Sequence, residues 1–195
     1  DIMDPSNNLN SQIQSVRELE LQGKVKSYFS QTPSWEVLSL GIKPATYDEV
    51  YNPYLDRQDL LGDVRTRQAL AYCIDRDKIN KDVLFSQSQV ATSYMPAGHQ
   101  NAVTDLTTYP YDPEKGASLL TEVGWQDADG DPTTPRVSSG VFNVFNGQEL
   151  NLTYTLSDTP LHREVAGIVV ESLKACGVGI NPVFVSSADL VASGP

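Results

Sequence analysis

The sequence predicts an α/β fold, in which helices flank a mixed β-sheet with parallel strand pairs. Between Glu149 and Val185, a strand-like, a helical and a second strand-like pattern follow one another, which is the order of a βαβ unit. The stretch Gly62–Leu84 predicts two successive capped helices, because it contains capping aspartates and no Gly or Pro after its first residue.

The helix pair is expected to be the rigid element around which the chain is organised. Asp63 can accept hydrogen bonds from the free N–H groups of a first turn, so a helix is predicted over Val64–Ile74. Its second half, Ala69–Ile74, is apolar on nearly every side and should be buried. Asp75 is a candidate second N-cap, so a short helix should begin almost at once.

The N-terminal part is polar and mixed. A short amphipathic helix is expected before Gly23, which ends it. Two strands are expected after it, at residues 24–29 and at Trp35–Ile42. The tyrosine-rich stretch Pro44–Leu61 is expected to be an irregular surface loop.

The second half alternates turn signals with regular patterns. Ser86–Tyr109 predicts a long loop, and Asp112 with the following Pro predicts a helix that Gly124 ends. Val141–Phe145 and Glu149–Leu156 predict two strands, joined by a tight Asn-Gly hairpin. Three further elements are expected: a helix capped by residues 157–160 and ended by Gly177, a strand at Gly179–Val185 covered on both faces, and the start of a helix in 186–195.

The composition argues against several classes of function. Twenty-five acidic and 14 basic side chains give a net charge of −11, which would repel nucleic acid, so no nucleic-acid partner is expected. No apolar run approaches the length of about 18 residues that a membrane-spanning helix needs. The chain begins Asp-Ile-Met without a basic-then-apolar leader, so a processed protein or a fragment is expected.

The two cysteines are compatible with one disulfide or with two buried thiols. Cys73 lies in the expected buried half of the first core helix, and Cys176 ends the last long helix. An extracytoplasmic compartment would permit a bridge between them, and both states stay open at this point.

An aspartate-rich turn is the best candidate metal site. Alternate carboxylates in a tight turn can converge on a hard cation, and this turn contains Asp127, Asp129 and Asp131. It does not match an EF-hand loop, which has Gly at position six and a bidentate Glu at position twelve. Counted from Asp127, these positions are Pro132 and Ser138. A plain acidic turn is expected, with a calcium-stabilised structural module as the alternative.

Ser157, Asp158 and His162 supply the residue types of a hydrolase triad. Asp and His at neighbouring helical positions are not expected to orient an imidazole toward a serine on the preceding strand. A hydrolase that uses these three residues is therefore only the alternative, and no catalysis and no cofactor are expected.

Three ordered motifs resemble the family 5 extracellular solute-binding proteins, the oligopeptide, dipeptide and nickel receptors of ABC importers. The motifs are DVRTRQALAYCIDRDKI at 63–79, TSYMPAG at 92–98 and YPYDPEKGASLLTEVGW at 109–125. In that family, a strand that corresponds to Trp35–Ile42 has an Asn near its end, whereas this chain reads Leu40-Gly41-Ile42 there.

The resemblance implies a lobe like that of the type II periplasmic-binding proteins. Residues 1–195 would form a single lobe, similar to domain III, of a larger two-lobed protein, with 1–34 as a hinge-proximal segment. The protein would be periplasmic or extracellular and associated with the cell envelope. A lipid anchor on the full-length protein would be consistent with this location. Its partners would be ABC permease subunits, the remaining lobe of the same protein, and a peptide or similar small solute.

The resemblance also suggests ligand-binding residues. Ligands collect beyond the carboxyl ends of strands in doubly wound folds, where the loop after Thr153–Leu156 should lie. In this loop, Asp158 is expected to pair with an amino group and Arg163 with a carboxylate. Capping and surface roles stay open for these residues. The complete candidate set is Ser157, Asp158, His162, Arg163, Tyr94 and Met95.

Overall fold

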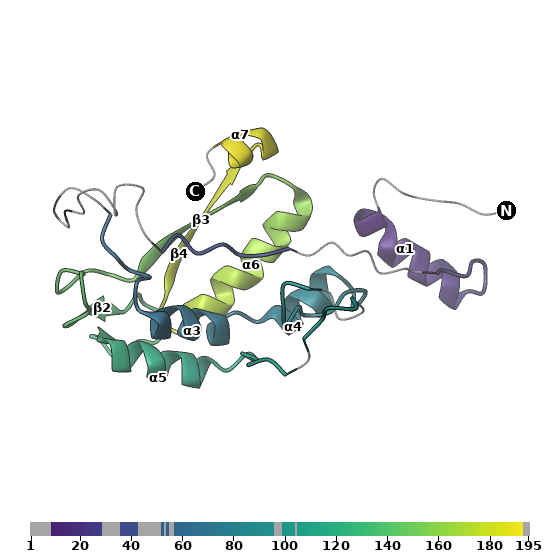
Figure 1. Ribbon diagram of the computed structural model, residues 1–195. Helices are drawn as coiled ribbons and strands as arrows, with labels where there is room; N and C mark the ends of the chain where they lie inside the picture. The colour runs from purple at the N-terminus through teal and green to yellow at the C-terminus, as the bar shows by residue number, and fades with distance from the viewer. Residues whose placement is uncertain are drawn as a thin grey trace. The chain divides into compact units, whose positions relative to one another are not determined.

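The computed structural model describes residues 9–28, 36–42, 52, 54, 57–95, 99–103 and 105–192 (Figure 1). They belong to two units: residues 1–36 with 77–106, and residues 37–76 with 107–195. The larger unit contains the strands that the structure describes and most of its helices.

The smaller unit contains the amphipathic helix α1 (Leu9–Leu21), and the prediction of this helix is confirmed. Gly23 follows it with a left-handed φ of +68°, which favours glycine. The Arg17 guanidinium donates to the Phe85 carbonyl oxygen at 2.6 Å and so ties α1 to the residues that follow the π-helical turn η1 (Ile79–Val83). This turn continues the short helix α4 (Arg76–Lys78), whose early start was predicted from Asp75.

Both strands predicted in the N-terminal part are wrong over the residues that the structure describes. After α1 the chain folds back, because the Ser27 backbone N–H and hydroxyl both donate to the Glu20 carboxylate. These hydrogen bonds lower the pKa of Glu20. Glu36–Ile42 also contains no strand, and Val37 is 62% exposed. Alternating apolar residues specify a strand only where one face is buried, which is not the case here. The tyrosine-rich stretch Pro44–Leu61 lies largely outside the described residues.

Two capped helices form the core of the larger unit. α3 (Val64–Cys73) begins where the Asp63 side chain accepts from the Arg65 backbone N–H, and α5 (Pro113–Val123) is capped in the same way by Asp112. They lie side by side (Figure 1), and the Asp112 N–H donates to the Tyr72 carbonyl oxygen at 2.8 Å. The start of α5 therefore meets the end of α3. Both predicted helices are confirmed.

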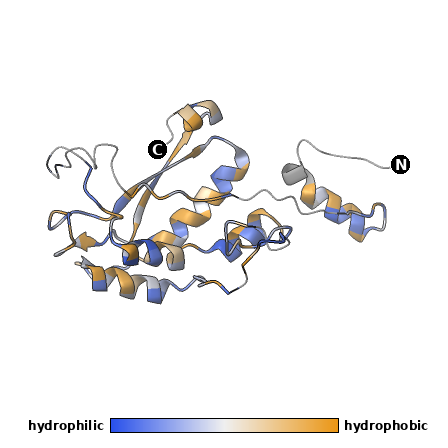
Figure 2. Ribbon diagram, viewed as in Figure 1, coloured by the Kyte–Doolittle hydropathy of each residue, from blue (hydrophilic) through white to orange (hydrophobic). Residues whose placement is uncertain are grey.

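The predicted βαβ unit is also confirmed. β3 (Asn151–Ser157) and β4 (Gly179–Val185) pair in parallel, and α6 (Pro160–Lys174) connects them. Both apolar and polar residues occur along α6 (Figure 2), and its buried side chains include Ala166, Val169 and Leu173. The expectation that β4 is covered on both faces is wrong, because its Asn181 and Val183 are exposed.

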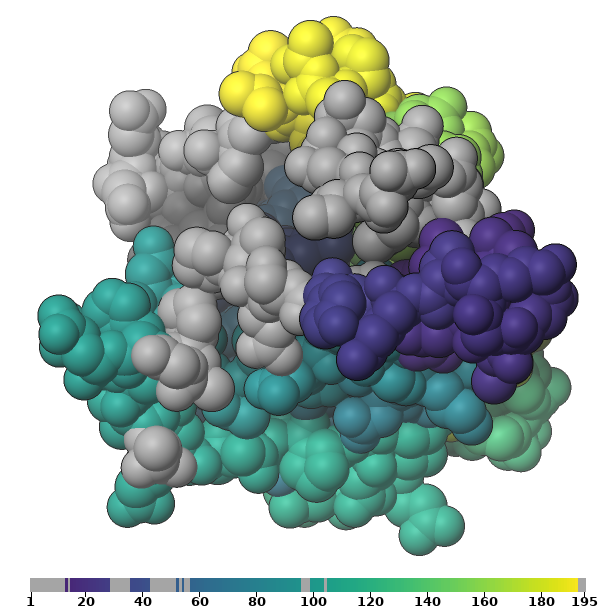
Figure 3. All heavy atoms as spheres, turned by 90° about the vertical axis from the view of Figure 1, so that its right-hand side faces the viewer, coloured from purple at the N-terminus to yellow at the C-terminus, as the bar shows by residue number. Residues whose placement is uncertain are grey.

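A hairpin is present, but its arms are not the residues that were predicted. Its arms are residues 136–138 and 147–150, joined by hydrogen bonds from Ser138 N to Gln148 O and from Leu150 N to Arg136 O. Val141–Phe145 is a loop rather than a strand, because Gly140 and Asn143 adopt left-handed φ values of +80° and +57°. The arm 136–138 includes β2 (Val137–Ser138), which pairs antiparallel with β1 (Trp125–Gln126). The chain continues beyond β4 into α7 (Ser187–Ala192), the further helix expected there, which lies at the surface in Figure 3.

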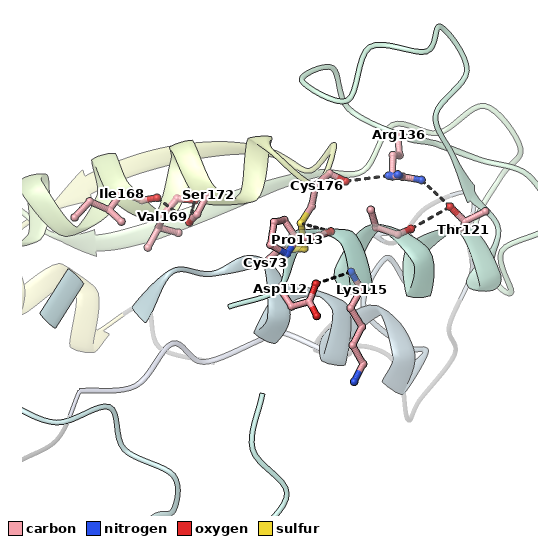
Figure 4. The surroundings of a disulfide bond; sticks show 11 residues. Cys73, Asp112, Pro113, Lys115, Thr121, Arg136, Ile168, Val169, Ser172 and Cys176 are labelled. Atoms are coloured by element: carbon pink, nitrogen blue, oxygen red, sulfur yellow. Dashed lines mark hydrogen bonds between the residues drawn. A yellow bond between two sulfur atoms is a disulfide. The ribbon is translucent and has the colours of Figure 1, made fainter. Parts of the chain in front are cut away.

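A disulfide and a buried arginine join these elements. Cys73 at the end of α3 and Cys176 after α6 form a disulfide, with their Cα atoms 6.1 Å apart (Figure 4). The Arg136 guanidinium donates to the Cys176 carbonyl oxygen at 2.9 Å and to the Trp125 carbonyl oxygen at 3.0 Å. It also donates to the Thr121 hydroxyl in the last turn of α5 at 2.9 Å. Burial lowers the pKa of Arg136.

The close approach of α5 to α3 predicts opposite effects for two helical glycines. A Cβ at Gly116 would lie 2.3 Å from Cys73 Sγ, whereas a Cβ at Gly167 in α6 would meet nothing within 4 Å. Gly116→Ala should lower the free energy of unfolding by about 1–3 kcal/mol through overpacking. The matched variant Gly167→Ala should raise it by up to about 1 kcal/mol through helix propensity. Urea denaturation measures both, and equal effects of the two variants would contradict the close approach.

Candidate functional site

The loop between β3 and α6 brings together four of the six predicted ligand-binding residues. β3 ends at Ser157, and the Asp158 backbone N–H donates to the Val185 carbonyl oxygen at the end of β4. The Thr159 hydroxyl then caps α6 by accepting from the His162 backbone N–H at 3.1 Å. The candidate loop therefore lies at the carboxyl ends of two parallel strands, where α/β folds bind ligands.

His162 turns back toward the end of β3. Its Nδ1 lies 2.6 Å from the Ser157 hydroxyl oxygen and 3.0 Å from the Thr159 hydroxyl oxygen. The expectation that an imidazole at this spacing cannot face the serine is therefore wrong. Only two residues separate the strand from the helix, so a side chain in the first turn of α6 reaches back to the strand end.

The three residues nevertheless do not form a Ser-His-Asp relay. The Asp158 carboxylate accepts from Arg163 Nε at 2.7 Å, so it is engaged by the guanidinium. Ser157 itself is only 7% exposed. A triad needs a carboxylate that orients the histidine and a serine that a substrate can reach. The geometry is that of a hydrogen-bonded helix start.

Arg163 is oriented by two contacts. Its guanidinium lies over the Phe184 ring, 4.3 Å from the centroid, while its Nε donates to Asp158. The Asp158 contact raises the pKa of Arg163. Neither terminal NH₂ group of Arg163 has a hydrogen-bond partner among the described residues, and the side chain is 54% exposed. A stacked guanidinium with free terminal groups is well suited to bind a carboxylate.

The structure adds Thr159 and Phe184 to the site, two residues that were not among the candidate ligand-binding residues. Phe184 pairs with Leu156 in the parallel register, so it lies at the strand ends beside the loop. The aromatic residue near the end of β4 was the only signal for it in the sequence, and its use depends on knowing that register.

Tyr94 and Met95 belong to the smaller unit. Tyr94 is 75% exposed, and the Ser93 hydroxyl donates to the Met95 carbonyl oxygen at 2.6 Å. The described parts of 86–109 contain neither helix nor strand, as predicted for this loop. The role of both residues in ligand binding stays a prediction.

The aspartate-rich stretch forms a turn that is closed by its own hydrogen bonds. Asp127, Asp129 and Asp131 accept backbone N–H groups from Gly130, Asp131 and Thr133, respectively. The Thr134 hydroxyl also donates to the Asp129 carboxylate at 3.0 Å. The backbone N–H of Asp131 is the largest cause of a lowered pKa at Asp129. Within the part of the chain that the structure describes, no group of three or more His, Cys, Asp or Glu side chains is arranged to hold a metal ion.

Comparison with known proteins decides the family. Residues 5–193 match the family described as bacterial extracellular solute-binding proteins, family 5 Middle. The chain belongs to this family. Its fold is shared with solved type II periplasmic-binding proteins of the same family, which confirms the predicted fold class.

Two curated relatives are named as peptide-binding proteins. The oligopeptide-binding protein AppA of Bacillus subtilis (strain 168) is 27% identical over 147 residues, which cover 73% of this chain and 25% of AppA. The dipeptide-binding protein of Escherichia coli (strain K12) is 36% identical over 74 residues, which cover 38% of this chain and 14% of that protein. The chain thus spans a quarter or less of the length of these relatives.

Solved structures resemble the chain at the level of the fold. The structure of Bacillus subtilis AppA in complex with a nonapeptide matches with a TM-score of 0.61 and 25% identity, over 70% of this chain and 26% of AppA. NikA from Brucella suis, solved with Fe(III)-EDTA, matches with a TM-score of 0.57 and 23% identity, over 67% of this chain and 25% of NikA. Among the described residues, none of the helices combines the length and the apolar character that a membrane span requires.

The self-contained hydrogen bonding of the aspartate turn predicts that stability does not depend on calcium. The melting temperature in a calcium chelator should equal that in excess calcium. A bound ion at a hundred times its dissociation constant would instead stabilise the fold by about 2.7 kcal/mol. Differential scanning calorimetry distinguishes the two, and a melting temperature that falls by several degrees in chelator would contradict the plain acidic turn.

Proposed function

We propose that this chain is one lobe of the substrate-binding component of an ABC importer, with a peptide or a similar small solute as ligand. Membership of the family supports the receptor role, and the two curated relatives are named as oligopeptide- and dipeptide-binding proteins. The protein delivers its ligand to permease subunits and performs no catalysis.

The observation that supports this role best is the Asp158–Arg163–Phe184 arrangement at the strand ends. Arg163 is held by stacking and by one hydrogen bond, and its terminal NH₂ groups remain for a ligand carboxylate. Asp158 is 48% exposed and can pair with an amino group. Ser157 and His162 support the base of the same loop, where the Ser157 hydroxyl oxygen lies 2.6 Å from His162 Nδ1.

The remaining lobe completes the site. In the proposed receptor, residues 1–195 form a domain III-like lobe, residues 1–34 lie near the hinge, and Tyr94 and Met95 line the ligand. The lobes close on the ligand by hinge motion, and closure is stabilised only by the difference in ligand affinity between the open and closed states. The location is periplasmic or extracellular, at the cell envelope, with a lipid anchor on the full-length protein.

The free guanidinium edge predicts a carboxylate-dependent affinity. In the full-length protein that contains this lobe, Arg163→Gln should weaken binding of a free-acid peptide by about tenfold to a hundredfold, since a hydrogen bond to a charged group contributes about 1.5–3 kcal/mol. The affinity for the same peptide with a C-terminal amide should not change. Titration calorimetry with di- to pentapeptides measures both.

Arg65→Gln is a matched control, because Arg65 is also an exposed arginine paired with a nearby aspartate, Asp63, at 2.6 Å. This variant should leave both affinities unchanged. If the wild-type full-length protein binds none of the peptides, peptide is the wrong ligand class. If it binds them but Arg163→Gln has no effect, the receptor role stands and the assignment of Arg163 is wrong.

A further inference from the structure

The disulfide lies beneath the backbone of α5 rather than at the surface. We propose that α5 shields the Cys73–Cys176 bond, so that thiols reduce it only when α5 separates from α3. This inference concerns a redox property of the fold and does not depend on the proposed transport function.

Burial removes direct access to both sulfur atoms. Cys73 is 0% exposed and Cys176 is 1% exposed, even though the bond joins the ends of two helices. In Figure 4 the bond lies between α3, the start of α5 and the end of α6. Thiol–disulfide exchange requires a thiolate to attack a sulfur atom and form a mixed disulfide, so an enclosed bond reacts slowly.

Gly116 is the residue at which α5 packs tightly against the disulfide. A Cβ at this position would lie 2.3 Å from Cys73 Sγ and 3.3 Å from Cys176 Sγ, so the α5 backbone lies against both sulfur atoms. The Pro113 carbonyl oxygen lies 3.5 Å from Cys176 Sγ. An attacking thiolate would need the space that this first turn of α5 occupies.

Contacts at both ends hold α5 in place. At its start, the Asp112 side chain accepts from the Lys115 N–H at 3.0 Å, and the Lys115 ammonium lies 4.4 Å from the centre of the Tyr72 ring of α3. At its end, Thr121 accepts from Arg136, which also binds the Cys176 carbonyl oxygen. Separation of α5 from α3 therefore breaks several contacts at once, which makes it rare.

Shielding by α5 also affects how the disulfide forms. The two cysteines are 103 residues apart in sequence, and an oxidant must reach them before α5 has docked. The bond should thus form during folding, in an oxidising compartment, and then be retained in moderately reducing surroundings. Reduction transfers two electrons and two protons from a dithiol, which becomes a cyclic disulfide, to the two cysteines, which become thiols.

The test measures reduction by dithiothreitol under native conditions, with a maleimide mass tag that counts free thiols over time. In the wild-type protein, reduction should be slower than in the urea-unfolded protein by at least about a hundredfold, because it waits for a rare opening. Gly116→Ala should accelerate native reduction by about tenfold or more, through the overpacking of α5 on the sulfur atoms. Gly167→Ala, the matched helical control, should not accelerate it.

A second variant keeps the test decisive if Gly116→Ala does not fold. Asp112→Ala removes the cap of α5 and should accelerate reduction, whereas Asp112→Asn preserves a capping oxygen and should remain close to wild type. Native wild-type reduction within about threefold of the unfolded rate would overturn the proposal, since a shielded bond must open first. Equal acceleration by Gly116→Ala and Gly167→Ala, or by both Asp112 variants, would also overturn it.

Discussion

The Arg136 guanidinium binds groups at the C-terminal ends of both α5 and α6, and the larger unit depends on this junction. Helix C-termini have unpaired carbonyl groups and a partial negative charge, so a cation there satisfies both needs. Arg136 is 8% exposed and has no salt-bridge partner among the residues described, so carbonyl and hydroxyl oxygens compensate for its burial. The adjacent disulfide closes a long loop, which in the chain-entropy account contributes about 4–5 kcal/mol.

This junction fixes one end of α6, and the candidate ligand loop lies at the other end. Cys176 ties the C-terminal end of α6 to α3, while Thr159 and His162 form its N-terminal end at the strand edge. The loop is thus preorganised by the packing of α6 and by its own hydrogen bonds. A rigid support of this kind suits a binding site, because less conformational entropy is lost when a ligand binds.

Local signals predicted the capped helices and the βαβ unit correctly, because Asp63, Asp112 and the glycines after α1 and α5 act within a few residues. The strands expected at 24–29 and 35–42 do not form over their described residues, because no buried face supports the alternation there. At the site, the sequence placed Ser157 and His162 close together but wrongly predicted that the imidazole does not face the serine. The length of the turn between β3 and α6 determines whether the two side chains meet. The Asp158–Arg163 pairing and the stacking on Phe184 depend on strand register, which the pattern does not contain.

Native-state hydrogen exchange tests most directly whether the junction couples the three helices. The free energy of opening is measured at buried positions, one in each of α3, α5 and α6: Leu70, Leu120 and Leu173. If the junction couples the helices, these amides share one opening energy, and Arg136→Gln lowers it equally at all three, because the helices open together. An α6 amide that opens independently, with an energy that Arg136→Gln leaves unchanged, would contradict it.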